Sequence, residues 1–197
     1  MASFPPVANE LDASNGDDKF IGGVLCVGLA CLDMQLIGAT KMEDPEAINT
    51  FQKTVYCAGG SAPMTSTALG HMGMEHVGAL IQLGDDGHGA EMRRQLGAAG
   101  VATGLCAGLM TGGGADDGAG VQTAVAVLPV FREGGGRACW VDLAANDLLT
   151  GEAILQVLSD NKDEICSKYK AFHFGYPHLL KNLQGEALRG LLAGARR

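Results

Sequence analysis

The apolar residues of this chain fall into short runs that alternate with amphipathic stretches. Residues 23–29 form a continuous apolar run that ends near a glycine, which is typical of a central strand covered on both faces. The remaining pattern predicts strands at 77–83, from 101 and at 171–176, and helices at 61–72, 88–98, 151–167 and 183–192. Strands that alternate with helices in this order predict an α/β fold with a doubly wound, mostly parallel, Rossmann-like sheet.

A second group of predicted strands has a different pattern. Residues 51–56 alternate polar and apolar side chains ahead of a Gly-Gly pair, which predicts a half-exposed strand that runs into a tight turn. Residues 122–131 and 137–143 predict a hairpin across the glycine-rich turn at 133–136. We expect these three segments to form a small antiparallel β lid beside the main sheet.

Composition narrows the class of protein. The chain has 197 residues, 47% hydrophobic and 18% charged, which is enough to bury a sizeable core. The formal net charge is -8, and the only basic clusters are Arg93-Arg94 and Arg196-Arg197. This balance argues against nucleic acid or an anionic membrane as a partner. The apolar stretch 21–37 contains Asp33 and several glycines, which favours a buried strand and turn over a membrane span.

The cysteines and the N-terminal residues indicate the compartment. The 6 cysteines include no Cys-x-x-Cys pair, so we expect reduced thiols in a cytoplasmic protein rather than disulfides or a zinc site. Residues 1–20 are polar and acidic, without the apolar core of a secretory signal or the arginines of a mitochondrial presequence. We expect these residues to be a disordered tail, followed over residues 21–197 by the N-terminal portion of an α/β domain.

Several motifs occur in the order in which the PfkB/ribokinase family of carbohydrate kinases carries them. The segments are VLCVGLACLD at 24–33, CAGGSAPMTSTALGHMG at 57–73, IQLGDDGHG at 81–89, LGAAGV at 96–101 and AFHFGYPHLL at 171–180. The resemblance extends over roughly Val24 to Leu180, and the opening VLCVGL is similar to ketohexokinase-like members. It implies a ribokinase-like fold, of which this chain is the N-terminal portion. The Gly-Asp-Asp segment is architectural in that family, so we interpret Asp85 and Asp86 as the entry to a helix rather than as catalytic carboxylates or metal ligands.

The resemblance also implies a substrate site. Asp33 stands where the family has an acidic residue that holds sugar hydroxyls, and a carboxylate beyond a strand suits that task. Gly59 and Gly60 would let the backbone approach the ligand, and the helix that Ser61 is expected to cap would offer free N–H groups to oxygen atoms. The implied substrate-binding residues are therefore Asp33, Gly59, Gly60, Ser61, Met64, Asn146 and Gly175.

Two departures from the family bear on activity. Where the family has an asparagine four residues after the second glycine, this chain has Met64, whose thioether is a weak acceptor and no donor. The family's catalytic signature Asp-Thr-x-Gly-Ala-Gly-Asp is absent. The similar segment at 114–121 has Val121 in the position of the base, and valine accepts no proton.

The expected function is that of a PfkB-type sugar kinase, a phosphotransferase that transfers the γ-phosphate of ATP to a sugar hydroxyl. We expect this chain to hold the substrate-binding half without the half that binds ATP and performs catalysis, and so to be inactive alone, with no catalytic residue of its own. ATP and Mg would serve the full-length family, and neither is expected to bind this chain alone. Nucleoside substrates stay open.

Two alternatives remain at this point. The chain could be a non-catalytic sugar-binding or interaction protein that forms a homodimer through the β lid, and Met64 together with the missing signature favours it. It could also be an unrelated α/β domain with similar glycine-rich turns.

Overall fold

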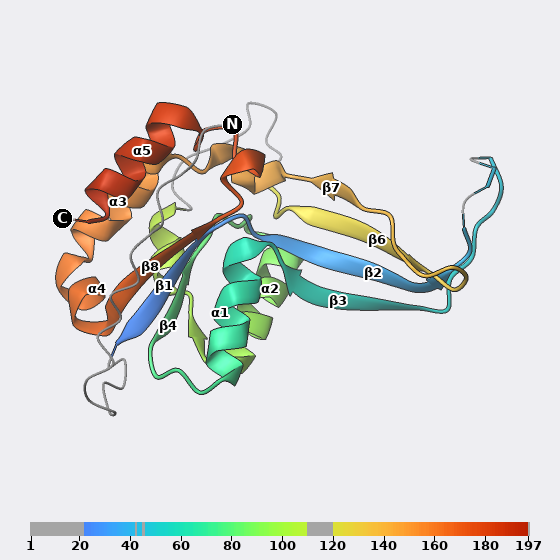
Figure 1. Ribbon diagram of the computed structural model, residues 1–197, viewed down its shortest axis with the longest axis horizontal. Helices are drawn as coiled ribbons and strands as arrows, with labels where there is room; N and C mark the ends of the chain where they lie inside the picture. The colour runs from blue at the N-terminus through green and yellow to red at the C-terminus, as the bar shows by residue number, and fades with distance from the viewer. Residues whose placement is uncertain (1–21, 42, 45, 110–119, 197) are drawn as a thin grey trace, which may run out of the picture.

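Two four-stranded sheets organise the chain, one covered by helices and one extending away from them (Figure 1). The computed structural model describes residues 22–41, 43–44, 46–109 and 120–196. The strands are β1 (Gly23–Gly28), β2 (Cys31–Ala39), β3 (Lys53–Gly59), β4 (Val77–Leu80), β5 (Val101–Ala102), β6 (Val125–Phe131), β7 (Trp140–Asp142) and β8 (Tyr169–Gly175). The α-helices are α1 (Ser61–His71), α2 (Gly87–Ala98), α3 (Gly151–Asp160), α4 (Lys162–Lys168) and α5 (Gly185–Gly194). Three short 3-10 helices are η1 (Gly104–Leu109), η2 (Ala144–Leu148) and η3 (Pro177–Leu179).

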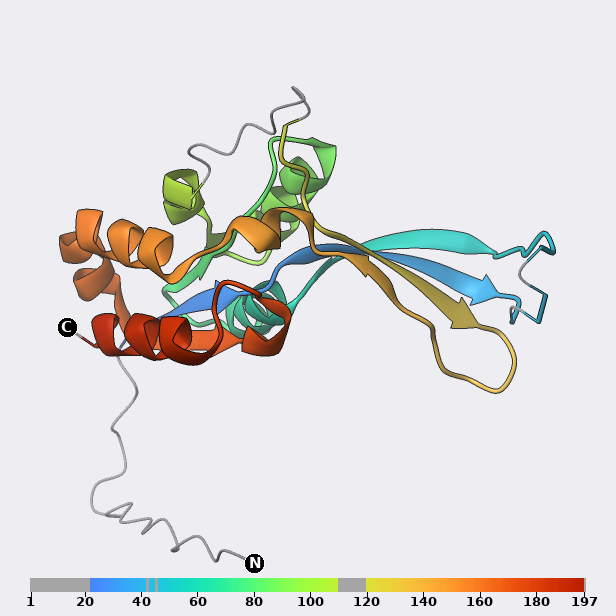
Figure 2. The same cartoon turned by 90° about the horizontal axis from the view of Figure 1, so that it is seen from above.

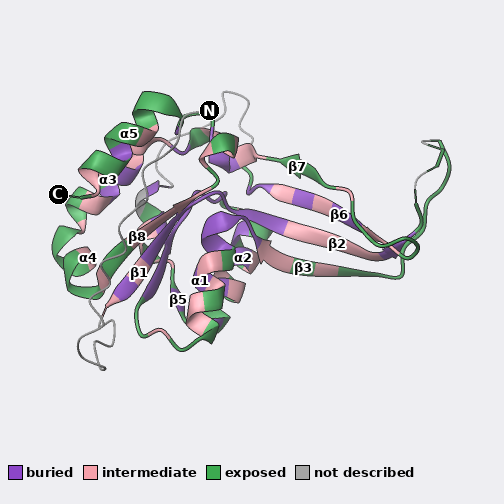
Figure 3. Cartoon of the chain, in the orientation of Figure 1, coloured by how far each residue is buried: buried purple, intermediate pink, exposed green. Residues whose placement is uncertain are grey.

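The first sheet, which we call the core sheet, has the strand order β5-β4-β1-β8 with every pair parallel. Side chains of a strand point alternately to its two faces. In β1, Cys26 packs against α1 and α2 in one apolar cluster, while Leu25 and Val27 pack against α3 and α5 in another. The predicted doubly wound α/β sheet is therefore confirmed (Figure 3).

The second sheet, which we call the lid, has the order β3-β2-β6-β7 and projects from one end of the core sheet (Figure 2). The pairs β2·β3 and β6·β7 are antiparallel, but β2 and β6 are parallel. The prediction of an antiparallel lid is thus wrong for one pair. The reason is that β2 and β6 both leave the core sheet in the same direction, β2 directly after β1 and β6 after the segment that follows η1.

Other predicted boundaries are corrected by local geometry. Residues 31–39, predicted to include a turn, form the long strand β2, and the strand predicted at 51–56 is β3, which runs to Gly59. The helix predicted over 151–167 is interrupted at Asn161, whose side chain donates to the carbonyl of Val157 at 2.8 Å. Residues 1–20 and most of the segment 114–121 lie outside the described residues.

Exposed apolar side chains mark the surface of the lid. Phe51, Tyr56, Trp140 and Val141 are exposed on or beside its outer strands. In the core sheet, β8 is an edge strand whose only partner within the described part of the chain is β1. No helix among the described residues has the length and apolarity that a membrane crossing requires.

Candidate functional site

The carboxyl ends of β1 and β8 meet at the point where the chain passes from the core sheet to the lid. Gly28 is the register partner of Gly175 there, and α1 begins beside them at Ser61. A Cβ on Gly28 would lie 2.9 Å from Ser61 Oγ, and one on Gly175 would lie 2.5 Å from Ser61 Cβ. The two glycines therefore leave room for Ser61 at the edge where open α/β sheets bind ligands.

Ser61 presents an unusual hydroxyl. The residue is only 8% exposed, and its Oγ has no hydrogen-bond partner among the described residues. Burying a hydroxyl without a hydrogen-bond partner destabilises the fold, and a hydrogen bond to a ligand oxygen would offset that cost. Ser61 was predicted to cap α1, but the capping position is Gly60, and no side chain caps the helix.

The backbone around Gly60 requires glycine for its conformation. Its φ is 90° and a Cβ would lie 2.4 Å from the carbonyl oxygen of Leu29, so any side chain would clash. The N–H of Ala62 donates to that same Leu29 oxygen at 3.3 Å, and Pro63 has no N–H. Met64 N–H donates to the carbonyl of Gly60 at 3.2 Å. The N–H groups of Ala62 and Met64 are therefore engaged within the chain and are not among those that the start of α1 could offer a ligand.

Asp33 lies on β2, two residues beyond the start of that strand, rather than on a turn. Its Oδ1 accepts a hydrogen bond from Cys31 Sγ at 3.2 Å, and a Cβ on Gly59 would come within 2.2 Å of the same oxygen. Burial raises the pKa of the Asp33 carboxyl, and the Cys31 thiol and the Arg137 guanidinium oppose that rise. Burial together with Asp33 raises the pKa of the Cys31 thiol, which stays protonated and donates.

Asn146 lies in η2, which follows the lid strand β7, and it binds the short connection between the core sheet and the lid at residues 29–30, which we call the neck. Its Oδ1 accepts the N–H of Ala30 at 3.1 Å, and its Nδ2 donates to the carbonyls of Ala30 at 2.8 Å and Leu143 at 3.0 Å. The side chain is 1% exposed. Its amide is thus already engaged with backbone groups, which indicates that Asn146 positions the segment between β1 and β2.

The other side chains near the start of α1 differ in exposure. Met64 is 58% exposed, so nothing in the core depends on its thioether. On the next residue, Thr65 Oγ1 lies 3.4 Å from His173 Nε2 on β8. His173 is thus a packed, hydrogen-bonded histidine.

Asp86, the second aspartate of the Gly-Asp-Asp segment, stands at the start of α2, as predicted. Asp86 Oδ1 accepts the N–H of Gly89 at 2.7 Å and so caps α2. Its Oδ2 accepts the N–H of Thr123 at 2.7 Å, a bond between core and lid that the sequence did not indicate. No group of three or more His, Cys, Asp or Glu side chains among the described residues could hold a metal ion.

A cavity among the described residues lies elsewhere in the fold. It has a volume of about 360 Å³ between β8 and the helices α3, α4 and α5, with Leu158, Ile165 and Phe172 among its lining residues. Tyr169 also lines it and stands at the amino end of β8, opposite the end that carries Gly175. The cavity therefore does not belong to the site at the neck.

Comparisons with known proteins bear on the fold. No family model and no curated protein matches the sequence. A carbohydrate kinase from Agrobacterium tumefaciens is similar in structure with a TM-score of 0.64 and 20% identity, over 89% of this chain and 50% of that chain. Ribokinase from Thermotoga maritima is similar with a TM-score of 0.56 and 15% identity, over 78% of this chain and 52% of that chain. A nucleoside kinase from Methanocaldococcus jannaschii is similar with a TM-score of 0.54 and 14% identity, over 88% of this chain and 58% of that chain.

These similarities confirm the fold implied by the sequence motifs. The chain has the ribokinase-like fold, which ribokinase-family kinases share. The chain spans about half the length of the solved structures that it matches.

Proposed function

We propose that this chain is the substrate-binding N-terminal portion of a PfkB/ribokinase-type kinase, which transfers the γ-phosphate of ATP to a hydroxyl of a sugar. The observation that carries the proposal is that the Asp33 carboxylate packs directly over Gly59, in the space that a side chain there would occupy. The ribokinase-like fold and the Gly28, Gly175 and Ser61 cluster at the neck support it. In this proposal residues 21–197 form one portion of a ribokinase-like domain, and the lid contributes Asp33 to its site.

The chemistry of the site suits a polyol. A carboxylate accepts hydrogen bonds from two neighbouring hydroxyls, which a sugar or the ribose of a nucleoside supplies. The Ser61 hydroxyl can donate or accept one more. Gly59, Gly60 and Gly175 keep side chains away from this edge, Asn146 holds the adjacent Ala30 backbone, and Met64 is exposed on the first turns of α1.

Phosphoryl transfer requires groups that the described residues do not combine. Such transfer depends on positioned phosphates, a metal ion and a base for the acceptor hydroxyl. The sequence contains neither Asp-Thr-x-Gly-Ala-Gly-Asp nor a Gly-x-x-x-x-Gly-Lys-Ser/Thr motif, and the described part of the chain offers no metal-binding group of three side chains. We therefore expect Mg-ATP not to bind this chain by itself, and we assign it no catalytic residue and no step of the transfer. A cytoplasmic location suits this proposal, because the described cysteines are all free thiols.

Calorimetric titration of the purified chain tests the proposal. D-ribose, D-fructose, adenosine and Mg-ATP are titrated separately into the wild-type chain and into Asp33→Ala. We expect one of the first three to bind and that binding to be lost in Asp33→Ala. Binding that persists in Asp33→Ala, or binding of Mg-ATP, would contradict the proposed site.

A second candidate function is self-association through the lid. Trp140 is 50% exposed on the outer strand β7, and Phe51, Tyr56 and Val141 add apolar surface to the same sheet. Exposed aromatic and aliphatic side chains are enriched at protein interfaces. Light scattering after size exclusion should show a dimer that Trp140→Arg converts to a monomer; a wild-type monomer at high concentration would exclude this function.

A further inference from the structure

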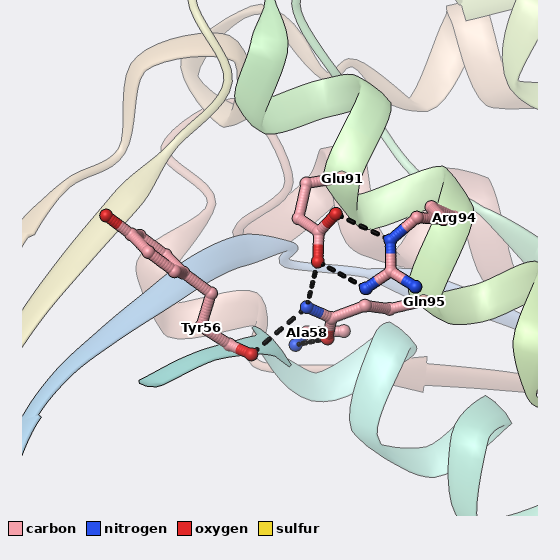
Figure 4. Close-up of polar contacts among 5 residues, drawn as sticks. All are labelled: Tyr56, Ala58, Glu91, Arg94 and Gln95. Atoms are coloured by element: carbon pink, nitrogen blue, oxygen red, sulfur yellow. Dashed lines mark hydrogen bonds and ion pairs between the residues drawn. The ribbon is translucent and has the colours of Figure 1, made fainter. Parts of the chain in front are cut away.

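One side chain of α2 binds the outer edge of the lid (Figure 4). The N–H of Ala58 donates to Gln95 Oε1 at 2.7 Å, and Gln95 Nε2 donates to the carbonyl of Tyr56 at 3.1 Å. A side-chain amide carries the same donor and acceptor as a peptide group. Gln95 therefore supplies two hydrogen bonds that a neighbouring strand would supply, on the edge of the lid where no strand of the described residues lies beside β3.

The bound segment lies directly opposite Asp33. Successive residues of a strand direct their backbone groups to opposite edges, so Cys57, between Tyr56 and Ala58, faces β2. Cys57 is the register partner of Asp33 on that strand. The residue after Ala58 is Gly59, over which the Asp33 carboxylate packs. Gln95 thus holds the part of β3 against which the carboxylate rests.

The amide of Gln95 has a fixed orientation. Its Nε2 also donates to Glu91 Oε1 at 2.8 Å, and Arg94 donates to both Glu91 oxygens, from Nε and Nη2, each at 2.7 Å (Figure 4). Hydrogen bonds from Arg94 and then Gln95 lower the pKa of the Glu91 carboxyl to about 2, so it only accepts near neutral pH. The nitrogen of Gln95 must therefore face Glu91, which leaves its oxygen for the N–H of Ala58.

The helix that carries Gln95 is anchored in the core. Met92 and Leu96, on another face of α2, are fully buried beneath the core sheet. At its start, Asp86 binds the N–H of Thr123, which leads into β6. α2 therefore connects the core to two strands of the lid. Asp86 makes the contact near β6, and Gln95 makes the contact with β3, the strand whose Gly59 lies beneath the Asp33 carboxylate.

We infer that Gln95 is a positioning residue, which acts through β3 to fix the Asp33 carboxylate over Gly59 and thereby sets the affinity of the site for its sugar or nucleoside. The part that concerns affinity rests on the proposed function. The part that concerns the carboxylate rests on the geometry of α2, β3 and β2 alone.

The test compares Gln95→Met with Gln156→Met in the full 197-residue chain. Methionine keeps the length of glutamine and removes its amide. Gln156 is the matched control, because its amide donates only within its own helix, to Asp160 at 2.7 Å. The readouts are amide hydrogen exchange of β3, the ¹³C signal of the Asp33 carboxyl, and calorimetric titration with D-ribose, D-fructose and adenosine.

Gln95→Met should speed exchange at Cys57 and Ala58 by about tenfold, as the loss of a pair of modest hydrogen bonds implies. It should also shift the Asp33 signal and weaken binding of the preferred probe by about tenfold, while Gln156→Met changes none of these. Unchanged exchange and an unchanged Asp33 signal would overturn the inference, as would faster exchange with unaltered affinity. A wild-type chain that binds no probe would instead overturn the proposed function, and the exchange and ¹³C data would still decide whether Gln95 positions Asp33.

Discussion

The carboxylate of Asp33 occupies the space in which a side chain at residue 59 would begin. A Cβ on Gly59 would lie 2.2 Å from Asp33 Oδ1, a separation that side chains do not reach. Gly59 is an ordinary residue of β3, in contrast to Gly60, whose φ of 90° favours glycine for conformational reasons. The first glycine of the pair is therefore required by the acid on the neighbouring strand, and the second by the turn into α1.

Gly59→Ala should displace the Asp33 carboxylate. The added methyl group forces the two strands or the carboxylate apart, at a cost of about 1–3 kcal/mol in the free energy of unfolding. Binding of a sugar or nucleoside should be lost. Urea unfolding and calorimetric titration measure the two effects. Gly97→Ala on α2 is the control, because a Cβ there meets nothing within 4 Å, and it should leave binding unchanged. Equal affinity in Gly59→Ala and wild type would contradict the role assigned to Asp33.

Ser61→Ala should stabilise the free chain and weaken ligand binding. Removing a buried hydroxyl without a partner removes a desolvation cost of about 1 kcal/mol or more. The same hydroxyl is proposed to bind the ligand, so affinity should fall by about tenfold. Thr67→Val is the control: its Oγ1 is also buried without a partner among the described residues, but it lies on a different face of α1. If both variants affect affinity equally, Ser61 does not contact the ligand.

Asp33 should make the free chain less stable as the pH rises. Because burial raises its pKa in the folded state above that of the unfolded chain, the folded state binds more protons between the two values. The contribution of Asp33 therefore falls as the pH rises through that window, which begins near the unfolded value of about 4. Asp33→Asn should be more stable than wild type at neutral pH, and the difference should shrink toward pH 3. Urea unfolding across this range checks it; a difference that grows on acidification would show the opposite sign.

Asn146→Ala should destabilise the fold rather than act on the ligand alone. It leaves the buried N–H and carbonyl of Ala30 without their partner, which costs about 2–4 kcal/mol. Asn182→Ala is the control, because the hydrogen bond from its side chain to the carbonyl of Asp147 is exposed; its cost should stay within about 1 kcal/mol. Chemical unfolding measures both. A stability equal to wild type in Asn146→Ala, with binding lost, would instead make Asn146 a direct ligand contact.

Much of the core sheet could be predicted because its signals are local. The continuous apolar run in β1 reflects burial on both faces. The spacing of apolar residues predicts the helix α2, and the side chain of Asp86 caps it. β2 was missed because its polar members Asp33 and Gln35 interrupt the apolar run that leads into it. Under the proposed function Asp33 is polar because the site needs a carboxylate, and a functional requirement of that kind weakens the pattern that would otherwise reveal the strand.

The sequence by itself determined the alternation of strands and helices, the faces they bury, and the glycines and acid that resemble a sugar-kinase site. Only the tertiary structure decided that β2 pairs in parallel with β6, that Asn146 binds Ala30, and that Gln95 binds β3. The physical reason is that periodicity reports which side chains are buried, whereas the partner of a strand edge or a side-chain amide is chosen by contacts between residues far apart in the chain. A side-chain amide uses the same carbonyl oxygen and NH₂ group to bind a ligand or a backbone, and the residues around it decide which of the two it binds.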